Sequence, residues 1–384
     1  MDDSADDSAG SEALNLRSLF RGLTAERVLF YVAIASLWVA AIISVTINDQ
    51  IPGGWVAGWH RWDAEWYYQI WKDGWGFDPH TLVFMPVFPW LTGALADLTS
   101  LSFAAAAILI NLPSYCVAGV IAAEFLDRRF KVPWWGVFVF HLCSPVAFFA
   151  FVPYSDALFC LLFWCAVVVV SEQSDFSFTR WRQHLPPGLL LMLLPLVRMT
   201  GFALVVWVFF RRWSAFAALL ALAFFLYMNL KVTGEALFFL NTQLEFAMPT
   251  GWFGDGLLAV VDELLRPPLL PEQRVLWLQT SVLPLLSTLL ILVTAGWLAG
   301  RRQWFFLGTL LAVAFFSRNQ SYWRSVVRYD MPLVPMLALP WLTPPKGHRL
   351  KSFAVYFLTV VLLILGLVLQ LGIGHRFHLG FWGF

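Results

Sequence analysis

The sequence predicts an all-α polytopic membrane protein with about eleven transmembrane helices and amphipathic surface helices in the first outer loop. Hydrophobic residues make up 60% of the 384 residues, and the mean hydropathy is +0.71. Soluble domains are nearer half apolar. Apolar runs long enough to cross a bilayer recur along the chain, and basic residues separate them. Together these observations exclude a soluble globule.

The first 27 residues differ in composition from the rest of the chain. They are acidic and rich in Ser and Ala as far as Glu12, and then carry Arg17, Arg21 and Arg27. This composition predicts a disordered cytoplasmic tail over residues 1–27 and a single transmembrane domain over residues 28–384. Because the arginines precede the first apolar run, the positive-inside rule puts the N-terminus in the cytoplasm. The loop after that run then lies on the extracytoplasmic face.

The later apolar runs alternate with basic clusters. We expect eleven crossings, by residues 28–47, 103–126, 133–151, 157–171, 189–210, 213–230, 280–298, 303–316, 331–342 and 353–371, where the interrupted run 189–210 counts twice. Residues 84–98 are short and open with Pro86 and Pro89, so we expect a surface or re-entrant helix there. Most Lys and Arg residues fall in loops that this topology assigns to the cytoplasm, as the positive-inside rule requires.

The run at residues 189–210 is interrupted by Arg198-Met199-Thr200-Gly201. An arginine in mid-span with a glycine three residues later suggests two short helices that meet at an outward-facing point. The alternative is one continuous helix in which Arg198 pairs with a carboxylate, because intramembrane arginines nearly always have a partner. The sequence leaves both structures open.

The first outer loop is rich in tryptophan and in carboxylates. Four of its tryptophans recur at intervals of four, three and four residues: Trp55, Trp59, Trp62 and Trp66. This spacing predicts a helix along the membrane surface with the indoles on one face. Asp63 falls beside that stripe and can point away from lipid. Carboxylates are costly beside hydrocarbon, so they suggest a function here, although an aromatic anchor with solvated charges would show the same pattern.

The predicted topology gathers acids, arginines and neutral polar side chains on the outer face. They are Arg61, Asp63, Glu65, Asp78, Tyr154, Asp156, Arg198, Gln243, Arg324 and Arg328. A carboxylate can take a proton from a hydroxyl group, and guanidinium groups bind phosphate oxygens in pairs. The set therefore suits group transfer from a phosphate-linked donor. Arg318 also lies near the end of an apolar run, where an anion could be held.

Other chemistries find less support in the sequence. No basic cluster suggests a nucleic-acid partner, and the four cysteines lie inside apolar runs without ligand-like spacing. The protease, hydrolase and nucleotide-binding motifs HExxH, GxSxG, P-loop and GxGxxG are absent. No cofactor is certain. A divalent cation could bind Asp63 with Glu65 or Asp78, but these are fewer ligands than such ions take.

Three ordered motifs resemble a known family. They are Trp62-Asp63-Ala64-Glu65 with Gly74-Trp75 and Phe84-Met85-Pro86-Val87-Phe88-Pro89, then Ser144-Pro145 with Pro153-Tyr154-Ser155-Asp156, and Arg198-Met199-Thr200-Gly201. Their order and spacing across residues 55–205 resemble the PIG-V-type glycosylphosphatidylinositol mannosyltransferases and their prokaryotic relatives. Beyond residue 205 the similarity is one of pattern: an outer loop, then a polar segment that ends in Arg328-Tyr329. The resemblance departs at Trp66 and Trp75, where the family has histidine and tyrosine, and this leaves the acceptor undefined.

The resemblance implies a GT-C type helical bundle and an inverting glycosyltransferase. Its donor would be a polyprenyl- or dolichyl-phosphate sugar, with mannose expected, and its acceptor a lipid- or glycan-linked molecule on the extracytoplasmic face. Asp63 corresponds to the general base. Arg198 and Arg328, with Arg324, would bind the donor phosphate. The residues expected to position a sugar are Asp78, Tyr154 and Asp156.

A second hypothesis is a non-catalytic translocator or carrier-binding subunit for lipid-linked sugars. It would bind a lipid phosphate with the same arginines but would not require the acids of the first loop. An ion-coupled transporter is disfavoured, because the acids lie in outer loops rather than at mid-span. The expected location is the plasma membrane of a prokaryote or the endoplasmic reticulum of a eukaryote, with membrane lipids as partners.

Overall fold

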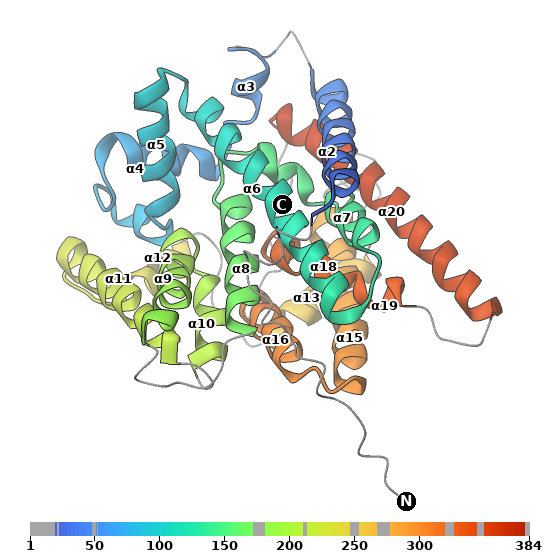
Figure 1. Cartoon of the computed structure of the whole chain (residues 1–384). Coiled ribbons are helices and arrows are strands. Elements are labelled where there is room, and N and C mark those ends of the chain that lie inside the picture. Colours follow the sequence, from blue (N-terminus) through green and yellow to red (C-terminus); the bar gives the residue numbers. More distant parts are fainter. Residues whose placement is uncertain are drawn as a thin grey trace, which may run out of the picture.

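The computed structural model describes residues 20, 23–47, 51, 53–171, 181–209, 213–245, 253–266, 277–318, 326–343 and 349–380. Within these ranges the protein is all-helical and contains no strand (Figure 1). The helical part of the fold prediction is therefore confirmed.

Five helices in the described part of the chain are long and apolar enough to cross a membrane. They are α2 (Ala25–Thr46), α6 (Phe103–Phe130), Ala215–Thr233 with α11 (Ala218–Thr233), Thr280–Gly300 with α15 (Leu283–Gly300), and Phe357–His378 within α20 (Arg349–His378). Shorter apolar helices include α8 (Asp156–Ser171) and α16 (Trp304–Arg318). A membrane protein follows from these lengths, while the eleven crossings and the GT-C arrangement stay predictions.

Helix α2 begins earlier than the sequence prediction placed it. It starts at Ala25, because the Thr24 side chain caps its N-terminus by accepting a hydrogen bond from the Arg27 N–H. Residues 25–27 thus belong to the helix and not to the tail. The remainder of the predicted disordered tail lies almost wholly outside the described residues.

Two predicted crossings are broken into short helices. Residues 133–151 form α7 (Trp134–Leu142) and the 3₁₀ helix η2 (Ala147–Phe151), with Pro145 between them. Residues 331–342 form η6 (Met331–Leu333), α18 (Val334–Leu337) and α19 (Leu339–Leu342). Proline has no N–H to donate and its ring clashes with the preceding turn, so Pro145, and Pro332, Pro335 and Pro340 in the second run, prevent one continuous helix.

The segment between α2 and α6 keeps its predicted name, the first outer loop, although its side of the membrane stays a prediction. It is helical but not as one helix. It forms α3 (Gly54–Gly58), α4 (Asp63–Asp73), η1 (Pro79–Val83) and α5 (Val87–Thr99). The single tryptophan-faced helix predicted across Trp55–Trp66 is therefore wrong, because the chain turns between α3 and α4. Trp59 is fully buried and stacks on Phe151 and Phe377, whereas Trp62 is 43% exposed.

Helix α8 lies at the centre of the fold and packs on α6 and on α9 (Trp181–Val197) (Figure 1). Around it one large apolar core joins most of the helices. A smaller apolar cluster, built on Ile70, Trp75, Leu82, Met85 and Phe225, fastens the first outer loop to α11. The other described helices of the second half are α10 (Gly201–Phe209), η4 (Trp213–Ala217), α12 (Phe238–Glu245), α13 (Phe253–Leu265), η5 (Leu278–Val282) and α17 (Val326–Tyr329).

Polar contacts lie at the two ends of α2, since Arg27 is in its first turn and Trp55 donates a hydrogen bond to Thr46 at its last residue. At one end the Arg27 guanidinium binds Glu124 at 2.6 Å and Asp127 at 3.1 Å. At the other end His378, in the last turn of α20, contacts the Trp55 carbonyl oxygen at 2.7 Å. Helices α3–α5 lie at this second end (Figure 1). The predicted topology requires this separation of Arg27 from the first outer loop; which end faces the cytoplasm stays a prediction.

Candidate functional site

Four charged side chains from distant parts of the chain meet beside the first outer loop. They are Asp63 at the start of α4, Asp156 at the start of α8, Arg198 just after α9, and Arg328 in α17. Arg328 Nη1 lies 2.9 Å from Asp63 Oδ2, and its Nε lies 3.6 Å from Asp156 Oδ1. Arg198 Nη1 lies 2.7 Å from Asp156 Oδ2. We call these four side chains the charge cluster.

Most of the charge cluster is buried. The side chain of Asp156 is 2% exposed, and those of Arg198 and Arg328 are 8% exposed. Asp63 is the most accessible of the four, with 22% of its side chain exposed. Buried charges need partners, because removal from water costs several kcal/mol per ion. Asp156 therefore lies beneath the two arginines and holds them together, while Asp63 forms the exposed edge of the cluster.

Tyr154 ties the cluster to the first outer loop. Its hydroxyl donates to the Arg61 carbonyl at 3.2 Å and accepts from the Asp63 backbone N–H at 3.3 Å. The Arg328 guanidinium lies over its ring, 4.8 Å from the centroid, which is a cation–π contact. Burial, with a smaller contribution from the Asp63 charge, raises the pKa of Tyr154 well above its usual value. The phenol therefore stays protonated and keeps both hydrogen bonds.

Tyr67 fixes the other side of Asp63. It lies one helical turn further along α4, on the same face, and its hydroxyl is 2.9 Å from Ser155 Oγ. Burial raises the pKa of Tyr67 to about 12, although Arg198 acts in the opposite direction. This bond joins α4 to the residue just before α8. The two helix starts that carry Asp63 and Asp156 are thus locked together.

The backbone is strained immediately before Asp63. Trp62 has φ 55° and ψ −118°, a combination that residues with a Cβ rarely adopt. Such strain costs roughly 1–3 kcal/mol and persists only where the surroundings impose it. Here it turns the chain sharply between α3 and α4, so that Asp63 opens the new helix. The carboxylate then benefits from the positive end of the helix dipole.

The charge of Arg328 is secured by its neighbours. Burial by itself lowers the pKa of an arginine, but the Asp156 and Asp63 carboxylates outweigh this effect and hold the pKa of Arg328 above its usual value. Its guanidinium also lies 5.6 Å from the ring centroids of Phe149 and Tyr329. Arg328 is therefore a permanent cation held between two acids and a set of aromatic rings.

The segment that carries Arg328 is anchored by a second, fully buried ion pair. Arg318, at the end of α16, donates from Nη1 and Nη2 to the two Asp330 oxygens at 2.8 and 2.7 Å. The same guanidinium donates to Thr288, Ser317 and Ser287, so α15 and α16 hold it from two sides. Asp330 is two residues from Arg328. The anion that the sequence led us to expect near Arg318 is thus Asp330 of the protein itself.

The helix break at Arg198 combines the two structures that the sequence left open. Helix α9 ends at Val197 and α10 begins at Gly201, so the helix is interrupted as predicted. Arg198 is also paired with a carboxylate, Asp156. The turn is tight: a Cβ on Gly201 would lie 2.5 Å from the carbonyl carbon of Leu194. A glycine is therefore needed where α10 folds back on α9.

We expect Gly201→Ala to lower the free energy of unfolding by about 1–3 kcal/mol, the usual cost of an overpacked contact. The clash is with backbone atoms of α9, which cannot move aside as a side chain could. Thermal unfolding in detergent measures the loss. Gly296→Ala is the matched control, since a Cβ there meets nothing within 4 Å. Equal stability of the two variants would contradict the close packing of α10 on α9.

Several residues predicted for the site lie outside the charge cluster. Glu65 is 57% exposed and pairs with His60 at 3.3 Å. Asp78 caps η1 and accepts from the His80 N–H at 2.8 Å; this hydrogen bond lowers the pKa of its carboxyl group despite partial burial. The Arg61 side chain lies against the turn at Gly380, although its carbonyl joins Tyr154.

Two further predicted residues have no side-chain description. Gln243 belongs to α12, but its side chain lies outside the described part of the structure. Arg324 lies outside the described residues altogether. The predicted roles of both stay predictions.

The sequence interpretation missed three groups around the cluster: Tyr67, Ser155 and Asp330. A signal existed for each. Tyr67 lies four residues after Asp63 on the same helical face, and Ser155 precedes Asp156. Asp330 is a lone acid beside the long apolar run 331–342, where a buried arginine partner is the usual explanation.

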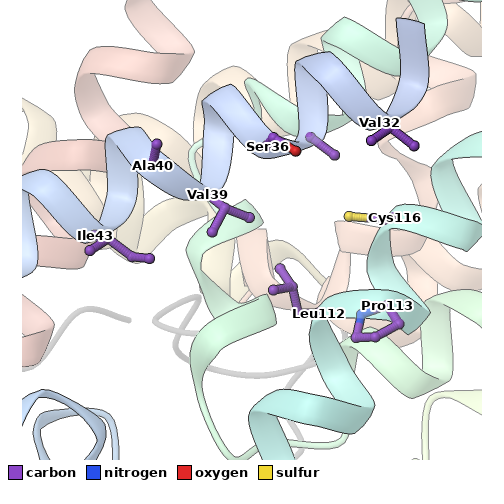
Figure 2. Close-up of a pocket in the computed structure, with 9 residues that line it drawn as sticks. Val32, Ser36, Val39, Ala40, Ile43, Leu112, Pro113 and Cys116 are labelled. Carbon is purple, nitrogen blue, oxygen red and sulfur yellow. The ribbon is translucent and has the colours of Figure 1, made fainter. Parts of the chain in front are cut away.

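Metal ligands and pockets were the remaining candidates for a site. Among the described residues no three His, Cys, Asp or Glu side chains gather as a metal site would need. A groove of about 440 Å³ between α2 and α6 has small and apolar walls, with Ser36, Pro113 and Cys116 among them (Figure 2). A second cavity, of about 240 Å³, lies between α7, α15, α18 and α20. Its walls are mostly apolar and include Val327 and Asp330, the neighbours of Arg328 and Tyr329.

Comparison of the chain with models of protein families, with curated proteins and with solved structures found no match in any of the three. The resemblance of its motifs to the GPI mannosyltransferases therefore stays a prediction, and the charge cluster carries the functional argument.

Proposed function

We propose that the protein is an inverting membrane glycosyltransferase that moves a sugar, with mannose expected, from a polyprenyl- or dolichyl-phosphate donor to a lipid- or glycan-linked acceptor. The observation that carries this proposal is the position of Asp63. It is the accessible carboxylate of the charge cluster, and it lies 2.9 Å from Arg328. A proton acceptor beside guanidinium groups is what transfer from a phosphate-linked sugar requires.

The proposed reaction is a direct displacement. Asp63 takes the proton of the acceptor hydroxyl while the acceptor oxygen bonds to the anomeric carbon of the sugar. The bond between that carbon and the phosphate oxygen breaks, and its electron pair leaves with the lipid phosphate. Arg328 and Arg198 stabilise the charge that develops there, since guanidinium groups match phosphate oxygens in pairs. Attack opposite the leaving group inverts the configuration at that carbon.

The apolar cavity beside Arg328 supports a lipid-linked donor. Its mostly apolar wall is formed by helices of the bundle, and it borders Val327, the residue before Arg328. A lipid chain in that cavity would lie against Val327 of α17, the helix that carries Arg328. Five helices are long and apolar enough to cross a membrane, so the protein would have access to a donor lipid in the bilayer.

A non-catalytic protein that binds a lipid-linked sugar is the second candidate. The observation in its favour is that Arg198 and Arg328 both contact Asp156, so two guanidinium groups lie together and could hold a phosphate without any proton acceptor. In the non-catalytic protein the arginines would hold the lipid phosphate, and the bond between sugar and phosphate would stay intact.

One assay separates these functions. The purified protein in lipid nanodiscs is incubated with a panel of radiolabelled polyprenyl-phosphate sugars and with a membrane lipid extract as the acceptor source. We expect labelled sugar in a new glycolipid and release of free polyprenyl phosphate, with polyprenyl-phosphate mannose the best donor. Donor that binds but is recovered intact would favour the non-catalytic protein. Donors that neither bind nor react would contradict both functions.

A further inference from the structure

We propose that Asp63 and the donor phosphate compete for Arg328. Asp63 contacts Arg328 where the donor phosphate would bind, and donor binding displaces it. The inference rests on the proposed function and adds one step to it. Binding of the donor phosphate frees Asp63, the proposed base, from Arg328. Three features of the charge cluster lead to it: its charge balance, the unequal burial of its two carboxylates, and a buried N–H of Arg328 for which the described residues supply no hydrogen-bond partner.

Within the described residues, each guanidinium group of the charge cluster already has a carboxylate partner. Arg198 is committed to Asp156 at 2.7 Å, and its guanidinium lies 4.8 Å from the ring centroid of Tyr329. Arg328 is shared between Asp63 and Asp156. A phosphodiester carries one negative charge and would enter a cluster that is already neutral. Binding of the phosphate becomes favourable once one carboxylate moves away from its arginine.

Asp63 is the carboxylate that the phosphate can displace from its arginine. Asp156 is 2% exposed and contacts both arginines, so its movement would strand two buried cations. Asp63 is 22% exposed and contacts Arg328 through one oxygen. After displacement it can be hydrated, whereas Asp156 cannot. The cost of exchange is therefore lowest at Asp63.

Arg328 itself is held in place and has an unused donor. Tyr154 and Tyr329 flank its guanidinium, and the Arg318–Asp330 pair anchors the residues that follow it. Within the described part of the chain, Arg328 Nε is buried without a hydrogen-bond partner, since Asp156 Oδ1 is 3.6 Å away. Buried donors are normally satisfied. A phosphate that replaced Asp63 could accept from this N–H as well, which one carboxylate oxygen does not do.

The reaction then completes the exchange. When Asp63 accepts the proton of the acceptor hydroxyl it loses its negative charge. In the same step the phosphate gains one, because the electron pair of the broken bond stays on its oxygen. The summed charge of Asp63 and the phosphate is unchanged, but the attraction of Arg328 moves entirely to the phosphate. Loss of the proton to water restores the Asp63 carboxylate, which competes for Arg328 again and promotes release of the lipid phosphate.

The test measures binding of polyprenyl phosphate to the full-length protein in nanodiscs without acceptor. Asp63→Asn removes the competing charge and keeps the shape, so we expect it to bind polyprenyl phosphate about tenfold more tightly than the unmodified protein. Asp73→Asn, at the other end of the same helix, is the control and should leave affinity unchanged. Asp63→Ala serves the same purpose if the amide variant does not accumulate.

A double-variant cycle shows whether Arg328 is the shared partner. In an Arg328→Gln background Asp63→Asn should no longer increase the affinity for polyprenyl phosphate, because the guanidinium that Asp63 contacts is absent. Equal or weaker binding by Asp63→Asn in the native background would overturn the competition. A gain that persists without Arg328 would overturn it too, since it would show only a general effect of charge. If the unmodified protein transfers sugar while Asp63→Asn binds no more tightly, the proposed function stands and this inference fails.

Discussion

Asp63→Asn is expected to lower the rate of sugar transfer by roughly 100- to 10,000-fold, the usual contribution of a general base. The amide keeps the size and shape of the carboxylate, and it can still lie at the start of α4 beside Tyr154. It cannot accept the proton of the acceptor hydroxyl. Single-turnover transfer from a radiolabelled polyprenyl-phosphate sugar measures the loss directly.

The matched control for this variant is Asp73→Asn. Asp73 ends the same helix and is exposed, so the substitution removes one negative charge from α4 without touching the charge cluster. It should transfer sugar at the unmodified rate. Substantial turnover by Asp63→Asn would show that another group takes the proton, and the assignment of the base would then be wrong.

Arg318→Met is expected to cost about 3–5 kcal/mol of folding free energy, because it leaves the Asp330 carboxylate buried without its cation. Both side chains are 2% exposed, so water cannot take over the lost interactions. Thermal unfolding in detergent, or titration with denaturing detergent, measures the loss. The same variant should weaken donor binding, since Asp330 anchors the segment that carries Arg328.

Two controls identify the cause of that loss. Arg318→Met combined with Asp330→Asn leaves no uncompensated charge, and it should recover a large part of the stability. Arg266→Ala removes an exposed ion pair that has a single contact, with Asp262 at 3.0 Å, and should cost no more than about 0.5 kcal/mol. A double variant as unstable as Arg318→Met alone would show that the loss comes from packing and not from the stranded charge.

The class of the fold could be predicted from composition and from the long apolar runs. Helices α2 and α6 lie close to the predicted residues 28–47 and 103–126. The prediction was poorer where proline interrupts a run, as at Pro145 and Pro335. Hydropathy counts apolar residues but does not register a missing N–H group. Such segments therefore look like spanning helices in the sequence and form short helical pieces in the structure.

The residue types of the candidate site could be predicted from the sequence. The ion pairs between those residues could be predicted only in part. Asp63, Asp156, Arg198 and Arg328 do meet, although Asp63 and Arg328 are 265 residues apart. The spacing of the residues does not show that Asp63 pairs with Arg328 whereas Glu65 pairs locally with His60. Which acid finds which arginine depends on how the helices pack. That packing is a property of the whole bundle, and a motif of four residues does not contain it.

The strained backbone at Trp62 has a practical consequence for protein engineering. Glycine would adopt φ 55° with little strain, so a design method that scored backbone strain alone would favour Trp62→Gly. That choice would also loosen the sharp bend that places Asp63 beside Arg328. Anyone who stabilises this protein for crystallisation or industrial use should therefore hold position 62 fixed, however attractive the substitution looks on thermodynamic grounds.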